Sequence, residues 1–474
     1  MSEDSLKSEK KEKLKWWKSQ GIEPYGRKFV KEPIASLVPE KKGTISIAGR
    51  IMTIRRHGKA AFCDIMDHSG RIQVYFKKDI LGDVLFERFK NLDVGDIIGL
   101  KGELFVTHTG QLTLLVKDFV LLSKILGTLP EKWHGLRDVE VRYRRRYLDL
   151  IINPEVQKIF ITRSHILNII RNFLDGLGYI EVETPMMHQI PGGAEARPFV
   201  THHNALDMDL YLRIAPELFL KRLLVGGMEK VYEINRSFRN EGISTLHNPE
   251  FTMLELYSAY GDFMEMMELT ENLISNIVNK LFDSSRIDFG DTKIDFGLPW
   301  KKIYWEDCWK RFGIKNWRDK NEVKKAFSDL HLDTEGKEDV FELLDLLFKR
   351  KIEPELVDPT FIIRFPVEIS PLAKVWPDDQ SMVERFELYI GGLEIANAYS
   401  ELNDPIEQNE RFIREIEGPS ERPKVIDHDY IEALEYGMPP AGGLGIGIDR
   451  LVMILTGCPS IRDVILFPLL RPKQ

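Results

Sequence analysis

The stretch that most constrains the fold is Val231–Tyr257, two strand-like segments joined by a polar loop. Residues 231–238 and 250–257 alternate in the manner of β-strands. Turn formers such as Gly242 and Pro249 fill the loop between them. The pattern predicts an antiparallel hairpin, and an antiparallel sheet argues against a Rossmann nucleotide site. The sequence also has no GxxxxGK[ST] phosphate loop.

The predicted hairpin carries a set of side chains that suits a nucleotide. Its loop and second strand present Arg239, Glu241, His247 and Phe251. An arginine fork matches a phosphate, a histidine can assist it, and an aromatic ring can stack on a base. The alternative is a surface hairpin whose charges are solvated, and residue types alone leave both interpretations open.

Length and composition narrow the class of protein. A chain of 474 residues has room for two or three domains. No apolar run approaches the roughly 18 to 20 residues of a membrane span, and the charged N-terminus is not a secretory signal. The three cysteines form no CxxC motif, so we expect no zinc site and a reducing, cytoplasmic location. The net charge of −8 argues mildly against a general nucleic-acid binder without excluding a local basic surface.

Short strand-like runs separated by turns predict a small β-barrel over residues 44–126. A barrel of this kind commonly binds single-stranded nucleic acid. Phe62 could stack on a base and Gln73 could bond to a base edge, although a lone phenylalanine more often belongs to the core. We expect a helical extension over residues 1–43 and a basic hinge over residues 127–150.

The remainder of the chain begins with an amphipathic helix, predicted over Val156–Leu177. A strand follows at Tyr179–Glu183. Residues 262–360 are expected to be mostly helical, with a helical insertion at about 305–357. Strand character then returns and ends in GGLGIGIDR at 442–450, whose alternating glycines allow another surface to approach the strand closely.

Three of these segments carry a resemblance to a known family. The string FRNEG…HNPEFT…ELY resembles motif 2 of class II aminoacyl-tRNA synthetases, and within them the bacterial-type lysyl-tRNA synthetases. The helix and strand ending at Pro185 resemble motif 1, and GLGIGIDR resembles motif 3. The resemblance covers nearly the whole chain. It implies an α+β fold: a class II antiparallel sheet with flanking helices over residues 151–474, and an OB-fold anticodon-binding barrel over residues 44–126.

The resemblance implies a lysine–tRNA ligase, which converts L-lysine and ATP to lysyl-adenylate and pyrophosphate and then transfers lysine to tRNA(Lys). Such a reaction mainly requires that two anions be positioned and their charge offset. Arg239 and Arg450 are the implied catalytic residues, with Phe251 and Arg450 on either side of the adenine. Carboxylates suit Mg²⁺. The implied ATP site comprises Arg239, Glu241, His247, Asn248, Phe251, Glu387, Glu394 and Arg450, of which Glu387 and Glu394 bind Mg²⁺.

A lysine pocket needs an anionic end to a mostly apolar slot. By the same resemblance, Glu401 and Tyr257 meet the ε-ammonium, while Glu217 and the backbone of Gly193 meet the α-amino group. The full implied set is Gly193, Glu217, Arg239, Tyr257, Asn397, Tyr399 and Glu401.

The barrel residues implied to read a uridine-rich anticodon are Arg50, Arg55, Phe62, Gln73 and Gln111. Gln111 departs from the family pattern, because a glutamate is expected there and glutamine lacks its charge. Leu246 is a second departure, since some relatives carry arginine at that position and so have one more phosphate contact.

Three alternative functions fit part of this pattern. An aspartyl- or asparaginyl-tRNA synthetase shares the barrel and motifs, but Glu217 and Glu401 argue against it. A paralogue that attaches lysine to a protein would lack the barrel. A non-catalytic RNA-binding protein would not be expected to retain Arg239 and Arg450. Motif 1 implies a homodimer, and nothing in the sequence predicts a membrane partner.

Overall fold

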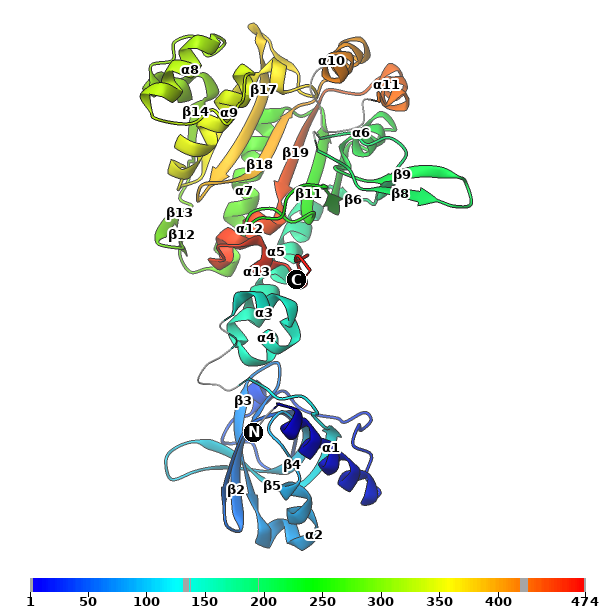
Figure 1. Ribbon diagram of the computed structural model, residues 1–474, viewed down its shortest axis with the longest axis vertical. Helices are drawn as coiled ribbons and strands as arrows, with labels where there is room; N and C mark the ends of the chain where they lie inside the picture. The colour runs from blue at the N-terminus through cyan, green and yellow to red at the C-terminus, as the bar shows by residue number, and fades with distance from the viewer. Residues whose placement is uncertain (1–2, 131–135, 137, 195, 418–424, 473–474) are drawn as a thin grey trace. The chain divides into compact units, whose positions relative to one another are not determined.

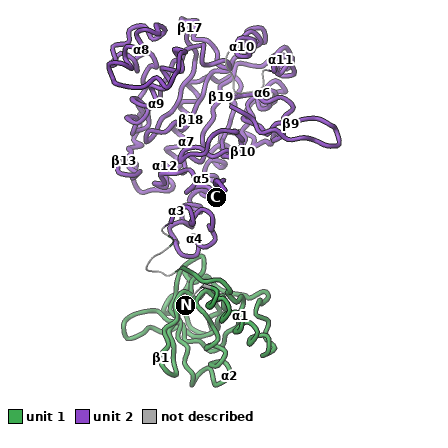
Figure 2. The backbone as a smooth tube through the Cα atoms, in the orientation of Figure 1, with its two compact units in different colours: residues 1–137 green, residues 138–474 purple. Residues whose placement is uncertain are grey.

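The chain folds into two compact units, Met1–Arg137 and Asp138–Gln474 (Figures 1 and 2). The computed structural model describes residues 3–130, 136, 138–194, 196–417 and 425–472. Residues 131–135 and 137 of the predicted hinge lie outside the described residues. None of the helices within the described ranges is long and apolar enough to cross a membrane.

The first unit is a closed five-stranded barrel in the order β1-β2-β3-β5-β4. Alternating apolar residues such as Ile47, Val74 and Val116 point inward and are fully buried. The N-terminal helix α1 (Glu3–Ser19) contributes Trp17 to the same core, where its indole donates to the carbonyl of Asn91. The bounds are β1 Ile45–His57, β2 Ala60–Met66, β3 Arg71–Lys77, α2 Lys78–Lys90, β4 Ile97–Val106 and β5 Leu112–Ser123.

A large, mainly antiparallel sheet organises the second unit, in the order β14-β15-β17-β18-β19-β11-β10-β6. The predicted hairpin is confirmed: β10 and β11 pair from Val231↔Tyr257 to Phe238↔Glu250. The strands are β6 Ile180–Glu181, β10 Lys230–Phe238, β11 Glu250–Ala259, β14 Lys301–Tyr304, β15 Thr360–Pro366, β17 Asp379–Ile390, β18 Leu393–Ser400 and β19 Ala441–Gly447, with β16 (Val375–Trp376) paired to β17.

Three helices cover one face of this sheet: α5 (Pro154–Gly176), α7 (Phe263–Leu281) and α12 (Ile448–Thr456) (Figure 1). Helix α5 confirms the amphipathic helix that was predicted over Val156–Leu177. Apolar residues of alternate parity on the central strands, such as Leu254, Ile446 and Leu388, meet the helices in the largest core. Residues of the other parity therefore lie on the opposite face, where the chemistry-bearing side chains are found.

The expectation that residues 262–360 are mostly helical was wrong for 286–304. That stretch forms the hairpin β12 (Arg286–Phe289) and β13 (Thr292–Asp295), followed by β14. Gly290 and Asp291 between two short strands are a hairpin signal, and Gly290 has the positive φ that such turns need. Residues 305–357 are helical, with η2 (Trp305–Phe312), α8 (Lys320–Asp329), α9 (Val340–Lys351) and η3 (Glu353–Glu355). They form the crossover that parallel pairing of β14 with β15 requires.

Several further helices and short strands of this unit lie outside the main sheet. They are α3 Val139–Arg144, α4 Arg146–Ile152, β7 Met187–His188, β8 Val200–His203, β9 Met208–Leu212, α6 Glu217–Val225, α10 Pro405–Glu417, α11 His428–Glu435 and α13 Ile461–Val464.

Candidate active site

Strand register gathers the predicted site residues into rows across the open face. One row runs Tyr257↔Gly443↔Tyr399 over β11, β19 and β18. The next runs from Glu255 through Gly445 and Asn397 to Glu387 on β17. Because alternate residues of a strand share a face, side chains from four strands converge here.

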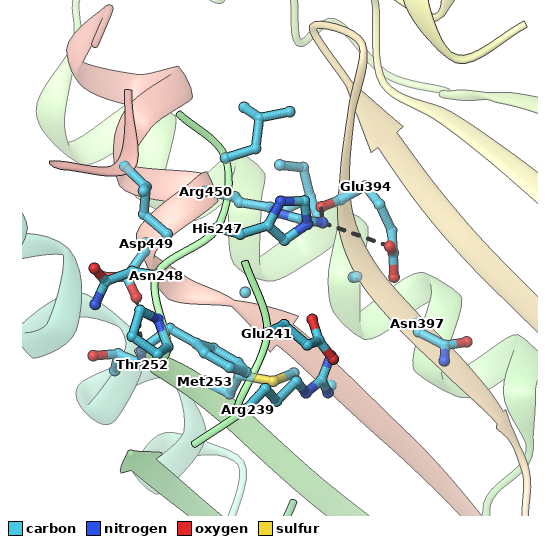
Figure 3. Close-up of a pocket in the computed structure, with 18 of the residues that line it drawn as sticks. Arg239, Glu241, His247, Asn248, Thr252, Met253, Glu394, Asn397, Asp449 and Arg450 are labelled. Atoms are coloured by element: carbon cyan, nitrogen blue, oxygen red, sulfur yellow. Dashed lines mark hydrogen bonds and ion pairs between the residues drawn. The ribbon is translucent and has the colours of Figure 1, made fainter. Parts of the chain in front are cut away.

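A cavity opens beside these rows, between the loop that joins β10 to β11 and the start of α12 (Figure 3). Leu246, which departs from the family pattern, also lines the cavity, as do Met253 and Asp449. Glu387 is the one predicted ATP-site residue outside the lining. The predicted residues that line the cavity are Arg239, Glu241, His247, Asn248, Phe251, Glu394 and Arg450.

Arg239 is a cation with unused bonding capacity. Its guanidinium carbon lies 5.1 Å from the centre of the Phe251 ring. Its Nε is buried and has no hydrogen-bond partner among the described residues. Burial lowers the pKa of Arg239 below its ordinary value, although Glu241 and Glu394 oppose that change. A buried, incompletely paired guanidinium beside an aromatic ring is well suited to an anion attached to a base.

Arg450, His247 and Glu394 form a second charged group across the cavity. The Arg450 Nη1 donates to the backbone carbonyl of Glu394 at 2.9 Å, and the Arg450 Nη2 lies 3.4 Å from the Nε2 of His247. Burial and the Arg450 guanidinium lower the pKa of His247, which favours a neutral imidazole. The Nδ1 of His247 is held by Ser244 at 3.0 Å.

Glu387 and Glu394 are the predicted magnesium ligands. The Glu387 carboxylate accepts from Arg385 Nη2 and from the Tyr389 hydroxyl, each at 2.6 Å. Burial raises the pKa of Glu387, and the Glu394 charge adds to that rise while Arg385 opposes it. Within the described ranges no three His, Cys, Asp or Glu residues cluster as a metal site. Two carboxylates fit Mg²⁺, because that ion commonly takes one or two carboxylates and completes its shell with phosphates and water.

The predicted lysine-pocket residues also come together. Glu217 opens α6, and its Oε1 accepts from the Tyr399 hydroxyl at 2.8 Å. Glu401, which follows β18, is 1% exposed, and Tyr257 is 4% exposed. Gly193 has a φ of +86°, and a Cβ there would lie 3.1 Å from the Cβ of Glu217. Arg239 and Asn397 instead line the neighbouring cavity, where the Asn397 Oδ1 accepts from Arg385 at 3.0 Å.

Sequence reasoning missed two ionisable residues of this pocket, Lys221 and Glu255. Lys221 is fully buried, and its Nζ lies 2.7 Å from Glu217 Oε1 and forms an ion pair with Glu401. Burial and the nearby Glu217 and Glu233 raise the pKa of Glu255 to about 8. Two signals were available: Lys221 lies four residues after Glu217 on a helix, and Glu255 has the same strand parity as Tyr257.

The barrel presents three of its five predicted residues on one outer face. Register joins Arg55↔Phe62↔Tyr75 in one row and Asp64↔Gln73↔Thr113 in the next. The Phe62 ring stacks on Tyr75 at 4.5 Å and is partly exposed, so the alternative that it belongs to the core is wrong.

The other barrel residues have local partners. Gln73 is 8% exposed, and its Oε1 accepts from the Thr113 hydroxyl at 3.1 Å. Arg50 donates to the carbonyl of Gly95 at 2.8 Å, and burial lowers its pKa. Gln111 is exposed, and its backbone is bonded to Thr107 in the turn before β5.

Comparison with known proteins identifies the family. Residues 138–471 match the family model described as tRNA synthetases class II (D, K and N), and residues 45–122 match the OB-fold nucleic acid binding domain. A lysine–tRNA ligase of Syntrophomonas wolfei is 54% identical, over 99% of this chain and 97% of the relative. Those of Pelotomaculum thermopropionicum and Carboxydothermus hydrogenoformans are 53% and 54% identical, each over 98% of this chain and over 94% and 97% of the relative. The chain therefore belongs to the class II tRNA synthetases (D, K and N).

Proposed function

We propose that the chain is a lysine–tRNA ligase, which activates L-lysine with ATP and transfers it to the 3′ end of tRNA(Lys). The three relatives above bear that activity in their names. The family also includes enzymes for aspartate and asparagine, so the amino-acid pocket decides. The buried carboxylates Glu217 and Glu401 carry the assignment, because they match an ammonium and would repel the side-chain carboxylate of aspartate.

Activation is proposed to depend mainly on positioning and charge. Arg239 would bind the α-phosphate and the lysine carboxylate, which offsets the negative charge that gathers as the carboxylate attacks phosphorus. Phe251 and Arg450 would hold the adenine between them, and His247 and Arg450 would face the γ-phosphate. Glu241 and Asn248 would line the nucleotide site.

Divalent metal is needed by such ATP-dependent ligases in general, and we propose Mg²⁺ held by Glu387 and Glu394. When bound, the ion would offset triphosphate charge. Arg385 and Tyr389, which bond to Glu387, would orient that carboxylate toward it.

The lysine side chain would lie between two carboxylates. Glu401 and Tyr257 would meet the ε-ammonium, and Glu217 with the backbone of Gly193 would meet the α-amino group. Asn397 and Tyr399 would complete the pocket. Each buried carboxylate left without an ammonium is costly, so neutral analogues would be rejected.

The barrel, residues 44–126, is proposed to read the anticodon, with residues 151–474 as the catalytic domain, 1–43 as an extension and 127–150 as a hinge. The half-exposed Phe62 ring beside Arg55 supports base stacking. Gln73, Arg50 and Gln111 would add hydrogen bonds to the RNA. We further propose a homodimer that works in the cytoplasm, where translation takes place.

Amino-acid-dependent ATP–pyrophosphate exchange across all twenty amino acids tests the proposal. Exchange with lysine alone is expected, whereas exchange with aspartate or asparagine would overturn the pocket, and none at all would indicate a non-catalytic protein. Glu401→Gln should raise the KM for lysine by at least about tenfold, because it removes a charge-assisted bond of about 1.5–3 kcal/mol. The KM for ATP should stay nearly unchanged, and equal effects on both would contradict the assignment.

A further inference from the structure

Lys221 already places an ammonium group between Glu217 and Glu401, the two carboxylates that are proposed to bind the substrate. Its side chain is fully buried in α6, with its Nζ 2.7 Å from Glu217 Oε1. The same Nζ forms an ion pair with the Oε2 of Glu401. The Tyr399 ring centre lies 5.5 Å from the Lys221 Nζ. The Tyr399 hydroxyl donates a hydrogen bond to Glu217 and so helps to hold that carboxylate in place.

The charges of this cluster are unequal. Two adjacent carboxylates in a water-poor site do not both stay ionised unless a cation compensates them. Lys221 supplies one positive charge against the two negative charges of Glu217 and Glu401, which leaves one negative charge over. The ε-ammonium of lysine would balance that charge, while its α-ammonium is balanced by the substrate's own carboxylate.

One oxygen of Glu401 remains available. Both of its oxygens are buried without a hydrogen-bond partner among the described residues, but Oε2 forms the ion pair with Lys221 and Oε1 has no ion-pair partner there. A Cβ at Gly443 would overlap that Oε1, so the absence of a side chain at this position makes room for the Glu401 carboxylate itself. A buried acceptor without a partner is costly, which favours a donor from the substrate at this atom.

We propose that Lys221 is a positioning and specificity residue: its ammonium group binds Glu217 and the Oε2 of Glu401 and leaves Glu401 Oε1 for the substrate ammonium. The proposal rests on the lysine–tRNA ligase function. Lys221 makes no bond to substrate in this arrangement and acts through the two carboxylates.

The titration of Glu401 gives the proposal a specific readout. Burial raises the pKa of Glu401, and the ammonium of Lys221 opposes that rise. Burial alone would lower the pKa of Lys221, but the two carboxylates hold it well above its ordinary value. Without the Lys221 charge, Glu401 should bind a proton at higher pH and lose its attraction for an ammonium. The other ionisable groups that face Glu401 are Glu217 from α6, Glu255 and Tyr257 from β11, Tyr399 from β18 and Tyr430 from α11.

The test is lysine-dependent ATP–pyrophosphate exchange by the full chain, measured from pH 5.5 to 9. In Lys221→Met, the acidic limb of kcat/KM for lysine should move up by about one pH unit, and the KM for lysine at neutral pH should rise at least about tenfold. The KM for ATP should change less than about twofold, since the nucleotide cavity is not altered.

Lys124→Met is the matched control. Lys124 is also fully buried and bonds to a fully buried carboxylate, Asp96, at 2.9 Å, but it lies in the barrel unit. Its loss should lower thermal stability and leave the lysine KM and the acidic limb unchanged. If Lys221→Met unfolds, Lys221→Gln takes its place, because its amide can still donate to both carboxylates without adding charge.

The outcomes separate the two hypotheses. A variant without the Lys221 charge that lowers stability but keeps the lysine KM and acidic limb of the unaltered enzyme would overturn the role of Lys221 alone. A shifted limb in Lys221→Met that returns toward normal in Lys221→Arg would support it, because arginine restores the charge. Absence of lysine-dependent exchange in the unaltered chain would overturn the proposed function and the role of Lys221 with it.

Discussion

Gly443→Ala should abolish most lysine activation although it adds a single methyl group. A Cβ at position 443 would overlap the Oε1 of Glu401 and lie 2.6 Å from the Cε1 of Tyr257. An ordinary carbon contact is about 3.5 Å, so the tyrosine ring must move by roughly 1 Å and the carboxylate by more. Neither can move into solvent, since Glu401 is 1% exposed and Tyr257 is 4% exposed.

A displacement of about 1 Å in a substrate-positioning group costs on the order of a hundredfold in rate, or about 2.7 kcal/mol. We therefore expect kcat/KM for lysine in pyrophosphate exchange to fall by roughly 10² or more, with the KM for ATP little changed. Gly445→Ala is the matched control for the lysine kinetics, because the nearest atom to its Cβ would be the flexible end of Met253, at 3.3 Å, although Gly445 itself lines the proposed nucleotide cavity. A Gly443→Ala enzyme with normal lysine kinetics would refute the assignment of Glu401 and Tyr257 to the lysine pocket.

Two further predictions concern a buried acid and the barrel. Because the folded-state pKa of Glu255 is raised to about 8, its contribution to stability is fully present below its unfolded pKa and is lost as pH rises toward 8. Glu255→Gln should therefore raise the melting temperature relative to the unaltered chain, and the difference should grow from pH 5 to 8. At pH 8 the difference in free energy of unfolding should reach up to roughly 4 kcal/mol. A difference independent of pH would contradict this. Phe62→Ala should raise the KM for tRNA about fivefold or more, because stacking on a base is worth about 1–3 kcal/mol. Pyrophosphate exchange without tRNA should be unaffected. An unchanged KM for tRNA in aminoacylation would show that Phe62 does not bind RNA.

Local sequence patterns were sufficient where the determining residues are close in the chain. The hairpin at 231–257 was predictable because strand alternation and turn formers lie within one short stretch, and the register confirms it. The hairpin at 286–295 was missed because its strands are four residues long and resemble a break between helices. Phe62 could not be assigned from sequence, since core and surface positions of a barrel strand differ only in register.

Resemblance predicted site residues that the structure brings close together, but it did not predict the charge balance among them. Lys221 and Glu401 are far apart in the chain and meet only because α6 lies against the sheet beside the end of β18. No periodicity in either segment records that contact. The i,i+4 spacing of Glu217 and Lys221 was the available signal for Lys221, and its natural sequence interpretation is an exposed ion pair on the helix surface.

The three alternating glycines of β19 have different physical causes. Gly443 is required by the protein itself, because Glu401 and Tyr257 occupy the place of a side chain. At Gly445 the nearest atom is the movable end of Met253, at 3.3 Å. At Gly447 the nearest protein atom would be 3.7 Å away, so the protein leaves room for a methyl group there. Gly447 lines the nucleotide cavity, and a side chain at that position would compete with a ligand and not with the fold. Under the proposed function one strand would serve both substrates: Gly443 makes room for the carboxylate proposed to bind lysine, and Gly447 leaves space in the cavity proposed to bind ATP.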